Sequence, residues 1–280
     1  MHPTRPICIH LPYGGMPVTT PTTTHLLIAL TAVTLMATAV IAQLPPDTYL
    51  GISEQYPTGS PAIGLDGLVA AYDMETLTPD GQLQDFSGNQ NHGTLHQTTL
   101  VQGLFGMARQ FATTDDVVDL PENPTFALDG PLSLALWFRL DSVGLHQHLF
   151  ACDDKFTLWI TPDNYIRFAD TQEMGFESVD GLAAETWYSL VAVLYGTAGD
   201  VLTEDNIAVF LNGEPVDGEI FGRWSPGGLH AQDACYIGLE SHQGQPFHNT
   251  LPFVGVIDEL LIFSRALTLS EIDVHAGLIR

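Results

Sequence analysis

The stretch WYSLVAVLY, residues Trp187–Tyr195, decides the fold of this chain. Alternate side chains of a β-strand point to opposite faces of its sheet. Read at that period, both faces of the stretch are apolar apart from Ser189. A strand that is apolar on both faces is expected in the interior of a sheet, between two other layers. The segment Leu132–Leu140 has the same character and is expected to lie in a similar place.

Outward from this stretch the chain consists of short β-branched or aromatic segments, interrupted by Gly, Asn, Asp and Pro. This pattern is typical of an antiparallel sandwich or barrel. The other strands predicted from the sequence are Leu68–Met74, Ala108–Ala112, Asp116–Leu120, His148–Ala151, Phe156–Thr161, Tyr165–Ala169, Asn206–Leu211, Tyr236–Leu239 and Phe253–Phe263.

Two local signals refine this prediction. Asn212-Gly213 lies between two strand-like segments, and a type I′ hairpin turn needs positive φ at both central residues, which Asn and Gly tolerate. Near the C-terminus Thr268 precedes Glu271 by three positions, which is the pattern of a capping box. A short closing helix is therefore expected from about Leu269 to Ala276.

The N-terminal region predicts export. Segment 25–42, HLLIALTAVTLMATAVIA, is apolar, uncharged and followed by no basic stop-transfer run. We therefore predict a signal peptide over 1–42, a Pro/Gly/Ser-rich linker over 43–66 and one domain over 67–280, in a secreted or cell-envelope protein. Two alternatives stay open: the segment is retained as a membrane anchor, or Met16 is the true start.

The chain carries 8 basic and 33 acidic side chains, a formal net charge of −25. A field of this sign repels phosphate backbones and anionic lipid head groups, so no nucleic-acid partner is expected, and a membrane contact is expected only through a retained anchor. Cations are the natural small partners, although an acidic surface also serves simply to keep a protein solvated.

Cys152 and Cys235 remain after removal of the predicted signal peptide, which contains Cys8. Two cysteines in an exported protein predict one disulfide bond. The alternative is a pair of buried free thiols that pack as small hydrophobic side chains.

Several segments also occur in the order seen in a known family. LVAAYDME, DFSGNQNHGTL, LSLALWFRL, TWYSLVAVLY, IAVFLNGEPV and FVGVIDELLIFSRALTLSEI resemble laminin-G-like jelly-roll domains of the concanavalin A-like lectin/glucanase superfamily, from about Gly67 to Ile272. The resemblance implies an all-β, two-sheet antiparallel jelly-roll sandwich with a short C-terminal helix. It also implies a frequent structural calcium ion and a role as a secreted carbohydrate-binding or adhesion module.

The loop DFSGNQNHG offers oxygen donors suited to calcium, namely Asp85, Ser87, Asn89 and Asn91, although the same residue types are common in ordinary turns. Asp258 lies within an apolar strand and therefore needs a cation, Arg265 or backbone donors. The resemblance implies that Asp258 reaches the same ion as the loop, with Asp73 and Glu75 as further ligands. Alternatively, Arg265 pairs with Glu259 in a purely structural role.

No catalytic residue is predicted. Glu271-Ile272-Asp273 approaches the carboxylate pattern of related glucanases, but it lacks the final Glu and falls in the predicted helix. His146 and His148 offer two nitrogen ligands for a transition metal, but without a third ligand nearby they are more typical of a surface loop. The residues predicted to bind the ligand are Asp153, Asp154, Trp224, Glu240, His242 and Gln243; for Trp224 a role in plugging the edge of the core is equally open.

The function predicted from the sequence is that of a non-catalytic module that binds a carbohydrate or an extracellular glycoprotein. A structural or adhesion domain of the cell envelope with a protein partner is the alternative. A glycoside hydrolase is the least favoured reading, because the carboxylate pair is incomplete.

Overall fold

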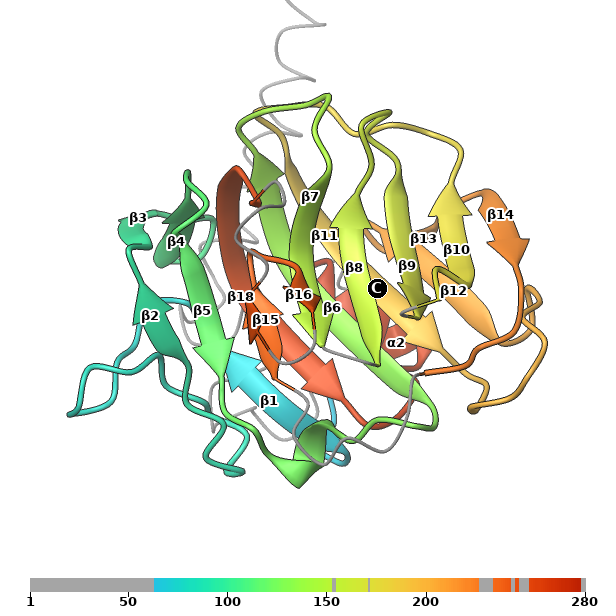
Figure 1. Ribbon diagram of the computed structural model, residues 1–280, viewed down its shortest axis with the longest axis horizontal. Coiled ribbons are helices and arrows are strands. Elements are labelled where there is room, and N and C mark those ends of the chain that lie inside the picture. Colours follow the sequence, from blue (N-terminus) through green and yellow to red (C-terminus); the bar gives the residue numbers. More distant parts are fainter. Residues whose placement is uncertain are drawn as a thin grey trace, which may run out of the picture. The chain divides into compact units, whose positions relative to one another are not determined.

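A computed structural model describes residues 63–152, 155–170, 172–226, 234–242, 245–246 and 252–277, all within the compact unit Asp47–Arg280. The described part consists of two antiparallel eight-stranded sheets, a two-stranded ribbon and a short C-terminal helix (Figure 1). The all-β jelly-roll sandwich implied by the resemblance is confirmed.

The first sheet, called sheet A, holds the strand that decided the fold. Its members are β1 (Leu68–Tyr72), β3 (Thr99–Gln102), β4 (Met107–Phe111), β6 (Leu132–Leu140), β11 (Trp187–Leu194), β12 (Ile207–Leu211), β13 (Glu214–Pro215) and β18 (Gly255–Phe263). Their order across the sheet is β13-β12-β11-β6-β18-β4-β3, and β1 also pairs with β18. The predicted central strands β11 and β6 therefore lie side by side in the interior of this sheet, as expected.

The second sheet, called sheet B, packs against sheet A. Its members are β2 (Thr94–His96), β5 (Val117–Leu120), β7 (Gln147–Cys152), β8 (Phe156–Ile160), β9 (Ile166–Asp170), β10 (Gly175–Ser178), β14 (Gly218–Phe221) and β15 (Cys235–Ile237). They follow the order β14-β10-β9-β8-β7-β15-β5-β2. A ribbon of β16 (Ser241–His242) and β17 (Gln245–Pro246) follows β15 in the chain, and a 3-10 turn spans Pro124–Phe126.

The apolar side chains form two layers, which explains why β11 is apolar on both faces. Leu190, Ala192 and Leu194 point into the main core between the sheets. Val191 and Val193 point the other way, into a second cluster beneath helix α2 (Leu269–His275). Sheet A is thus the middle layer of three over this region.

Helix α2 is fixed by the predicted capping box and by one arginine. Thr268 accepts a hydrogen bond from the backbone N–H of Glu271, and the Glu271 side chain accepts one from the backbone N–H of Thr268. Arg265 donates to both carboxylate oxygens of Glu271, at 2.9 and 2.6 Å. The alternative pairing of Arg265 with Glu259 is therefore wrong, because the carboxylate that Arg265 binds is that of Glu271 at the helix terminus.

The last residues of the predicted linker are also packed. Ile63 is buried in the cluster under α2, and the N–H of Gly64 donates to Glu271. The predicted signal peptide 1–42 and residues 43–62 of the predicted linker lie outside the described residues. Within the described ranges, no helix has the length and apolar composition required to cross a bilayer.

The Asn212-Gly213 turn forms as predicted, with φ of 54° and 83° at the two residues. It joins β12 to β13, whose residues Leu211 and Glu214 are direct partners. Strands β2, β3, β10, β14, β16 and β17 were not predicted, because they are short and carry little apolar alternation of their own.

Candidate ligand-binding face

One row of side chains crosses the outer face of sheet B, the face turned away from sheet A. The strand registers place its members directly opposite one another in pairs, from β7 to β14. We call this set the sheet B row; it consists of His148, Trp159, Arg167, Glu177 and Glu219. It combines a guanidinium group and two carboxylates with the rings of Trp159 and His148, which are both buried beneath this face.

Arg167 is the centre of the sheet B row. Its guanidinium lies 5.3 Å from the ring centre of Trp159 and 4.5 Å from that of Phe221. It also donates to Glu177 Oε2 at 2.8 Å and to the backbone oxygen of Glu173 at 2.7 Å. Contacts with two rings and a carboxylate hold the planar group in one orientation.

The histidines lie at the other end of the row. His148 is buried on β7, and His146, just before the strand, is exposed. Their Nε2 atoms are 3.0 Å apart, and both rings pack almost parallel to Trp159. Burial, and to a smaller extent His146, lowers the pKa of His148 to about 3. His148 is therefore neutral and lies on β7, in the predicted strand, whereas His146 lies in the loop before it.

Of the residues predicted to bind the ligand, Glu240 lies at this face. Its Oε2 is 3.8 Å from His148 Nε2, and the side chain is 35% exposed. The backbone of His242 lies in β16, which follows directly. Asp153, Asp154 and Gln243 lie outside the described residues, so their predicted role stays a prediction.

Trp224 does not belong to a ligand surface. Its side chain is completely buried, and its ring centre lies 5.5 Å from that of Phe168 in the core. A buried ring cannot offer its face to a ligand, so the prediction that Trp224 binds the ligand is wrong. The alternative role as a plug at the edge of the core is the one that the structure shows.

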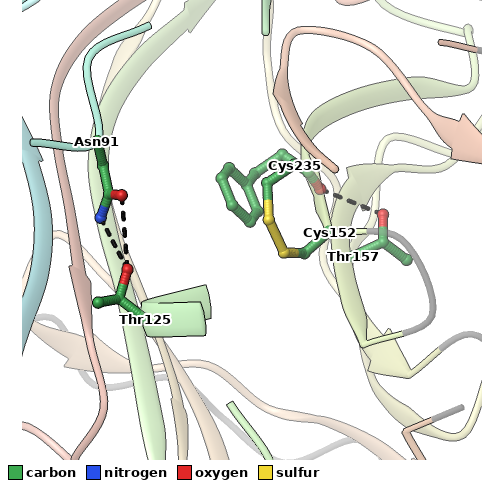
Figure 2. The surroundings of a disulfide bond; sticks show 6 residues. Asn91, Thr125, Cys152, Thr157 and Cys235 are labelled. Atoms are coloured by element: carbon green, nitrogen blue, oxygen red, sulfur yellow. Dashed lines mark hydrogen bonds between the residues drawn. A yellow bond between two sulfur atoms is a disulfide. The ribbon is translucent and has the colours of Figure 1, made fainter. Parts of the chain in front are cut away.

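The two cysteines form the predicted disulfide bond. Cys152 on β7 and Cys235 on β15 are direct partners in the sheet, and their sulfur atoms are bonded. Figure 2 shows the bond near Thr157, which lies on the neighbouring strand β8. Both cysteines face the main core, so the bond joins the middle strands of sheet B beneath the candidate face.

The residues predicted to bind calcium form two separate groups. The first group is the DFSGN loop, which is tied to β1. Asp85 Oδ1 accepts hydrogen bonds from the backbone of Ala71 and Ser87, and its Oδ2 accepts from Ser87 Oγ and the backbone of Asn91. The amide groups of Asn89 and Asn91 donate to backbone oxygens of β1, and Asn91 also contacts Thr125 (Figure 2).

This arrangement does not fit a calcium ligand set. Four donors already point at the two oxygens of Asp85, whereas calcium requires six to eight oxygen ligands around one point. The loop therefore acts as the ordinary hydrogen-bonded turn that the sequence left open. It fixes the start of β1.

The second group surrounds Asp258 on β18. Asp258 Oδ2 accepts from the backbone N–H groups of Leu104 and Phe105 at 3.0 and 3.1 Å. Its Oδ1 is buried and accepts no hydrogen bond from the described residues. Burial is the main cause that raises the pKa of Asp258 to about 7, and the nearby Glu75 and Asp73 raise it further, against the two backbone hydrogen bonds.

These contacts separate Asp258 from Asn89. Asn89 binds the carbonyl oxygens of Leu68 and Val69, and Leu68 pairs with Phe263, five positions along β18 from Asp258. Within the described part of the chain, no group of three or more His, Cys, Asp or Glu side chains is placed to hold a metal ion. These positions therefore do not support a single metal ion bound by all seven predicted ligands.

Glu259 is a buried carboxyl group that the sequence did not single out as a ligand. It is 2% exposed and has φ of 51°, at the irregularity of β18 between Asp258 and Leu261. Burial, followed by the charge of Asp258, raises its pKa well above the usual value. Two adjacent buried carboxyl groups on one strand make this an electrostatically costly place in the described domain.

A shallow hollow of about 440 Å³ lies elsewhere, at the edge of the sandwich. It is lined by Leu202, Thr203, Glu204, Asp205, Gly218 and Ile220. Ile220 alternates with Glu219 and Phe221 along β14, so the hollow lies on the other side of this strand from the sheet B row. It is a second surface against which binding experiments can be compared.

Two packed antiparallel sheets with a helix on one outer face define a lectin-type jelly roll, and comparison with known proteins agrees. Residues 112–273 match the model of the concanavalin A-like lectin/glucanases superfamily, and the chain belongs to this family. A comparison with curated proteins finds no match.

Three solved structures share the fold. The binding domain of Paraclostridial Mosquitocidal Protein 1 is 14% identical with a TM-score of 0.55, covering 76% of this chain and 52% of its own. Domain 4 of AbnA, a GH43 extracellular arabinanase from Geobacillus stearothermophilus, in complex with arabinotriose, is 18% identical with a TM-score of 0.53, covering 76% and 98%. Trypanosoma rangeli sialidase in complex with sialic acid is 15% identical with a TM-score of 0.56, covering 87% and 38%. This chain thus spans about half of the mosquitocidal protein's binding domain and less of the sialidase.

Trp159, Arg167, Glu177 and Phe221 were not predicted from the sequence. The alternation in FTLWI and IRFAD does place Trp159 and Arg167 on one face of their own strands. The sequence does not show that β8 and β9 pair in the register that sets these two residues opposite each other. Only that register turns separate polar residues into one surface.

Proposed function

We propose that this protein is a secreted, non-catalytic module that binds a carbohydrate or the glycan of a glycoprotein on the outer face of sheet B. The observation that carries the proposal is the sheet B row, in which Arg167 is held between two aromatic rings and beside Glu177. Sugars present hydroxyl groups along their edges and apolar C–H faces. A surface with an oriented guanidinium, carboxylates and the half-buried ring of Phe221 complements both.

The comparisons support a binding role at the level of the fold. The arabinanase domain is matched over almost its whole length, and its structure contains arabinotriose. The matched structure of Paraclostridial Mosquitocidal Protein 1 is that of its binding domain. The disulfide bond supports an oxidising compartment, in agreement with the predicted signal peptide.

The proposal that the protein is non-catalytic rests on the incomplete carboxylate pattern at Glu271-Ile272-Asp273 and on the position of this segment in the structure. Glu271 lies in the first turn of helix α2; burial acts to raise its pKa, but hydrogen bonds from Arg265, Thr268 and Gly64 lower it to about 2. A carboxylate held in this way stays ionised and engaged in packing, so it is poorly suited to act as a general acid.

Arg167→Ala should reduce glycan affinity at least about tenfold, since it removes a charge-assisted donor worth about 1.5–3 kcal/mol. The mature fragment is first screened on a glycan array that includes arabinan oligosaccharides, and the affinity for the best ligand is then measured by calorimetry. Arg167→Lys keeps the charge but loses the planar stacking, so an intermediate affinity is expected.

Arg139→Ala is the matched control. Arg139 also lies over an aromatic ring, Trp187 at 5.8 Å, and pairs with a carboxylate, Asp141 at 2.8 Å, but it belongs to sheet A. Its loss should leave glycan affinity unchanged. Glu204→Ala tests the hollow. If it reduces glycan affinity more than Arg167→Ala does, the binding site lies at the hollow and not on the outer face of sheet B. If the protein binds an envelope protein and sugars do not compete with that binding, the adhesion alternative is favoured.

We further propose that one hard cation, calcium in particular, sits at Asp258 and stabilises the domain. The unsatisfied buried Oδ1 of Asp258 supports this, as do the nearby carboxylates of Asp73 and Glu75. Asp73 and Glu75 already accept backbone hydrogen bonds, from Thr76 and Met107 respectively. The remaining ligands would have to be backbone oxygens or water, and the ion would be held largely through Asp258.

A further inference from the structure

His146 and His148 form a second, unassigned cluster on the outer face of sheet B. The two residues are separated by one position, so an extended backbone directs both side chains to the same face. His148 is 3% exposed, whereas His146 is exposed to solvent. The Nε2–Nε2 distance of 3.0 Å brings one ring nitrogen of each residue to the same point at the surface.

The hydrogen bonds of Thr157 determine which nitrogen of His148 carries a proton. Thr157 Oγ1 donates its single hydrogen to the backbone oxygen of Phe150 at 3.2 Å. With the hydroxyl hydrogen on Phe150, Thr157 Oγ1 accepts from Nδ1–H of His148 at 3.0 Å, and this is the tautomer on which the proposal relies. A neutral His148 then has a free lone pair on Nε2, directed at His146. Histidines that bind metals typically donate their other ring N–H to a neighbouring acceptor, which fixes the tautomer in the same way.

We propose that His146 Nε2 and His148 Nε2 together bind one divalent transition-metal ion, such as Zn²⁺, Ni²⁺ or Cu²⁺, at the edge of the sheet B row. Imidazole nitrogen prefers these ions over calcium. The two nitrogens face each other at 3.0 Å, and a metal–nitrogen bond is about 2.1 Å long, so the exposed His146 ring must swing away from His148 to admit one ion that touches both nitrogens.

Without the ion, His146 donates its Nε2 proton to the lone pair of His148. On binding, the proton of His146 moves from Nε2 to Nδ1 of the same ring by exchange with water. Both rings stay neutral, and two metal–nitrogen bonds replace one hydrogen bond. No oxidant or reductant takes part. The other coordination positions are filled by water or by an oxygen of a bound ligand.

The local charge favours a cation. Glu240 Oε2 lies 3.8 Å from His148 Nε2, and the chain carries a net charge of −25. The pair thus offers two nitrogens with a carboxylate nearby and leaves positions open. This role is independent of the proposed glycan contacts of Arg167, so either can fail without the other.

The test is titration of the EDTA-treated full chain with ZnCl₂ by calorimetry at pH 7.5, and with CuCl₂ followed by quenching of tryptophan fluorescence, because Trp159 lies 5.6 Å from His148 between ring centres. One ion per chain is expected. His146→Ala removes a metal ligand and should weaken binding at least about tenfold. Even the removal of a residue that only hydrogen-bonds to a metal ligand typically costs that much. Thr157→Val should weaken it to a smaller extent, since it removes the group that fixes the tautomer.

His96→Ala is the matched control. His96 is an exposed histidine of sheet B that pairs with Asp119 at 2.9 Å. Its substitution should leave the affinity unchanged. Melting curves without metal check that each variant is folded. Equal affinity of wild type and His146→Ala, equal losses in His146→Ala and His96→Ala, or the absence of any saturable binding would each overturn the proposal.

Discussion

Replacing both Cys152 and Cys235 by alanine should lower the free energy of unfolding by about 4 kcal/mol. The two residues are 83 positions apart, and a cross-link over so long a loop removes much of the conformational freedom of the unfolded chain. The bond also joins β7 to β15, which share only a three-residue pairing. Urea unfolding of the oxidised wild type and of the double variant measures the difference.

Alanine is preferred to serine in this experiment because both positions face the core, where a hydroxyl group would add its own desolvation cost. Reduced wild type should unfold near the midpoint of the double variant, which separates the loss of the bond from the loss of sulfur packing. Cys8→Ala, in the predicted signal segment, should leave the midpoint unchanged. A double variant within about 0.5 kcal/mol of the wild type, the range of ordinary surface substitutions, would contradict the prediction.

Asp258→Asn should stabilise the metal-free protein at pH 8 by as much as about 4 kcal/mol. Asn keeps an oxygen for the N–H groups of Leu104 and Phe105 and removes a buried charge. Because the folded pKa of Asp258 is about 7 and its ordinary value is 3.8, ionisation opposes folding. Below about pH 4 both states are protonated and the benefit vanishes. As the pH rises from about 4 to 7 the wild type loses this stability relative to the variant.

Calcium should make the wild type more stable than the Asp258→Asn variant, which is the reverse of their order without metal. An ion that binds only the folded form raises the melting temperature, and the neutral side chain of the Asp258→Asn variant should abolish this rise. Melting in EDTA and in millimolar calcium, at pH 5 and pH 8, measures both effects. Equal calcium shifts in the wild type and in Asp258→Asn would remove Asp258 from the ion site.

Asp85→Asn is the contrasting variant. Asp85 accepts four hydrogen bonds from Ala71, Ser87 and Asn91, and an amide group cannot accept all of them. Its replacement should destabilise the protein in EDTA and in calcium alike. A calcium response that depends on Asp85 would instead return the DFSGN loop to the ion site.

The prediction of the fold succeeded where local sequence carries the physical cause. The two apolar faces of β11, the Asn212-Gly213 turn and the capping box of Thr268 each depend on neighbouring residues, and all three occur as predicted. Strand β10, GFES, begins with glycine and has no apolar alternation of its own. It is a strand because β9 and β14 flank it.

The candidate sites were harder to predict, because their members meet only through register. Asp258 was correctly recognised as a carboxylate inside an apolar strand, but its neighbours are the backbone of Leu104 and Phe105 and not Asn89. For Trp224 the sequence left a ligand surface and a plug of the core equally open, and the hydrogen bond from the Ser225 backbone N–H to Asp170 holds its loop at the core.

The sequence by itself determined that this chain is a layered, antiparallel β-protein with a capped final helix, because alternation, turn chemistry and capping act over a few residues. Only the tertiary structure decided which surface carries the polar and aromatic groups. Trp159, Arg167 and Glu177 belong to three strands, and the pairing of those strands brings them into one row. A shift of register by one residue would turn Arg167 into the core, so this surface depends on contacts that no single segment encodes.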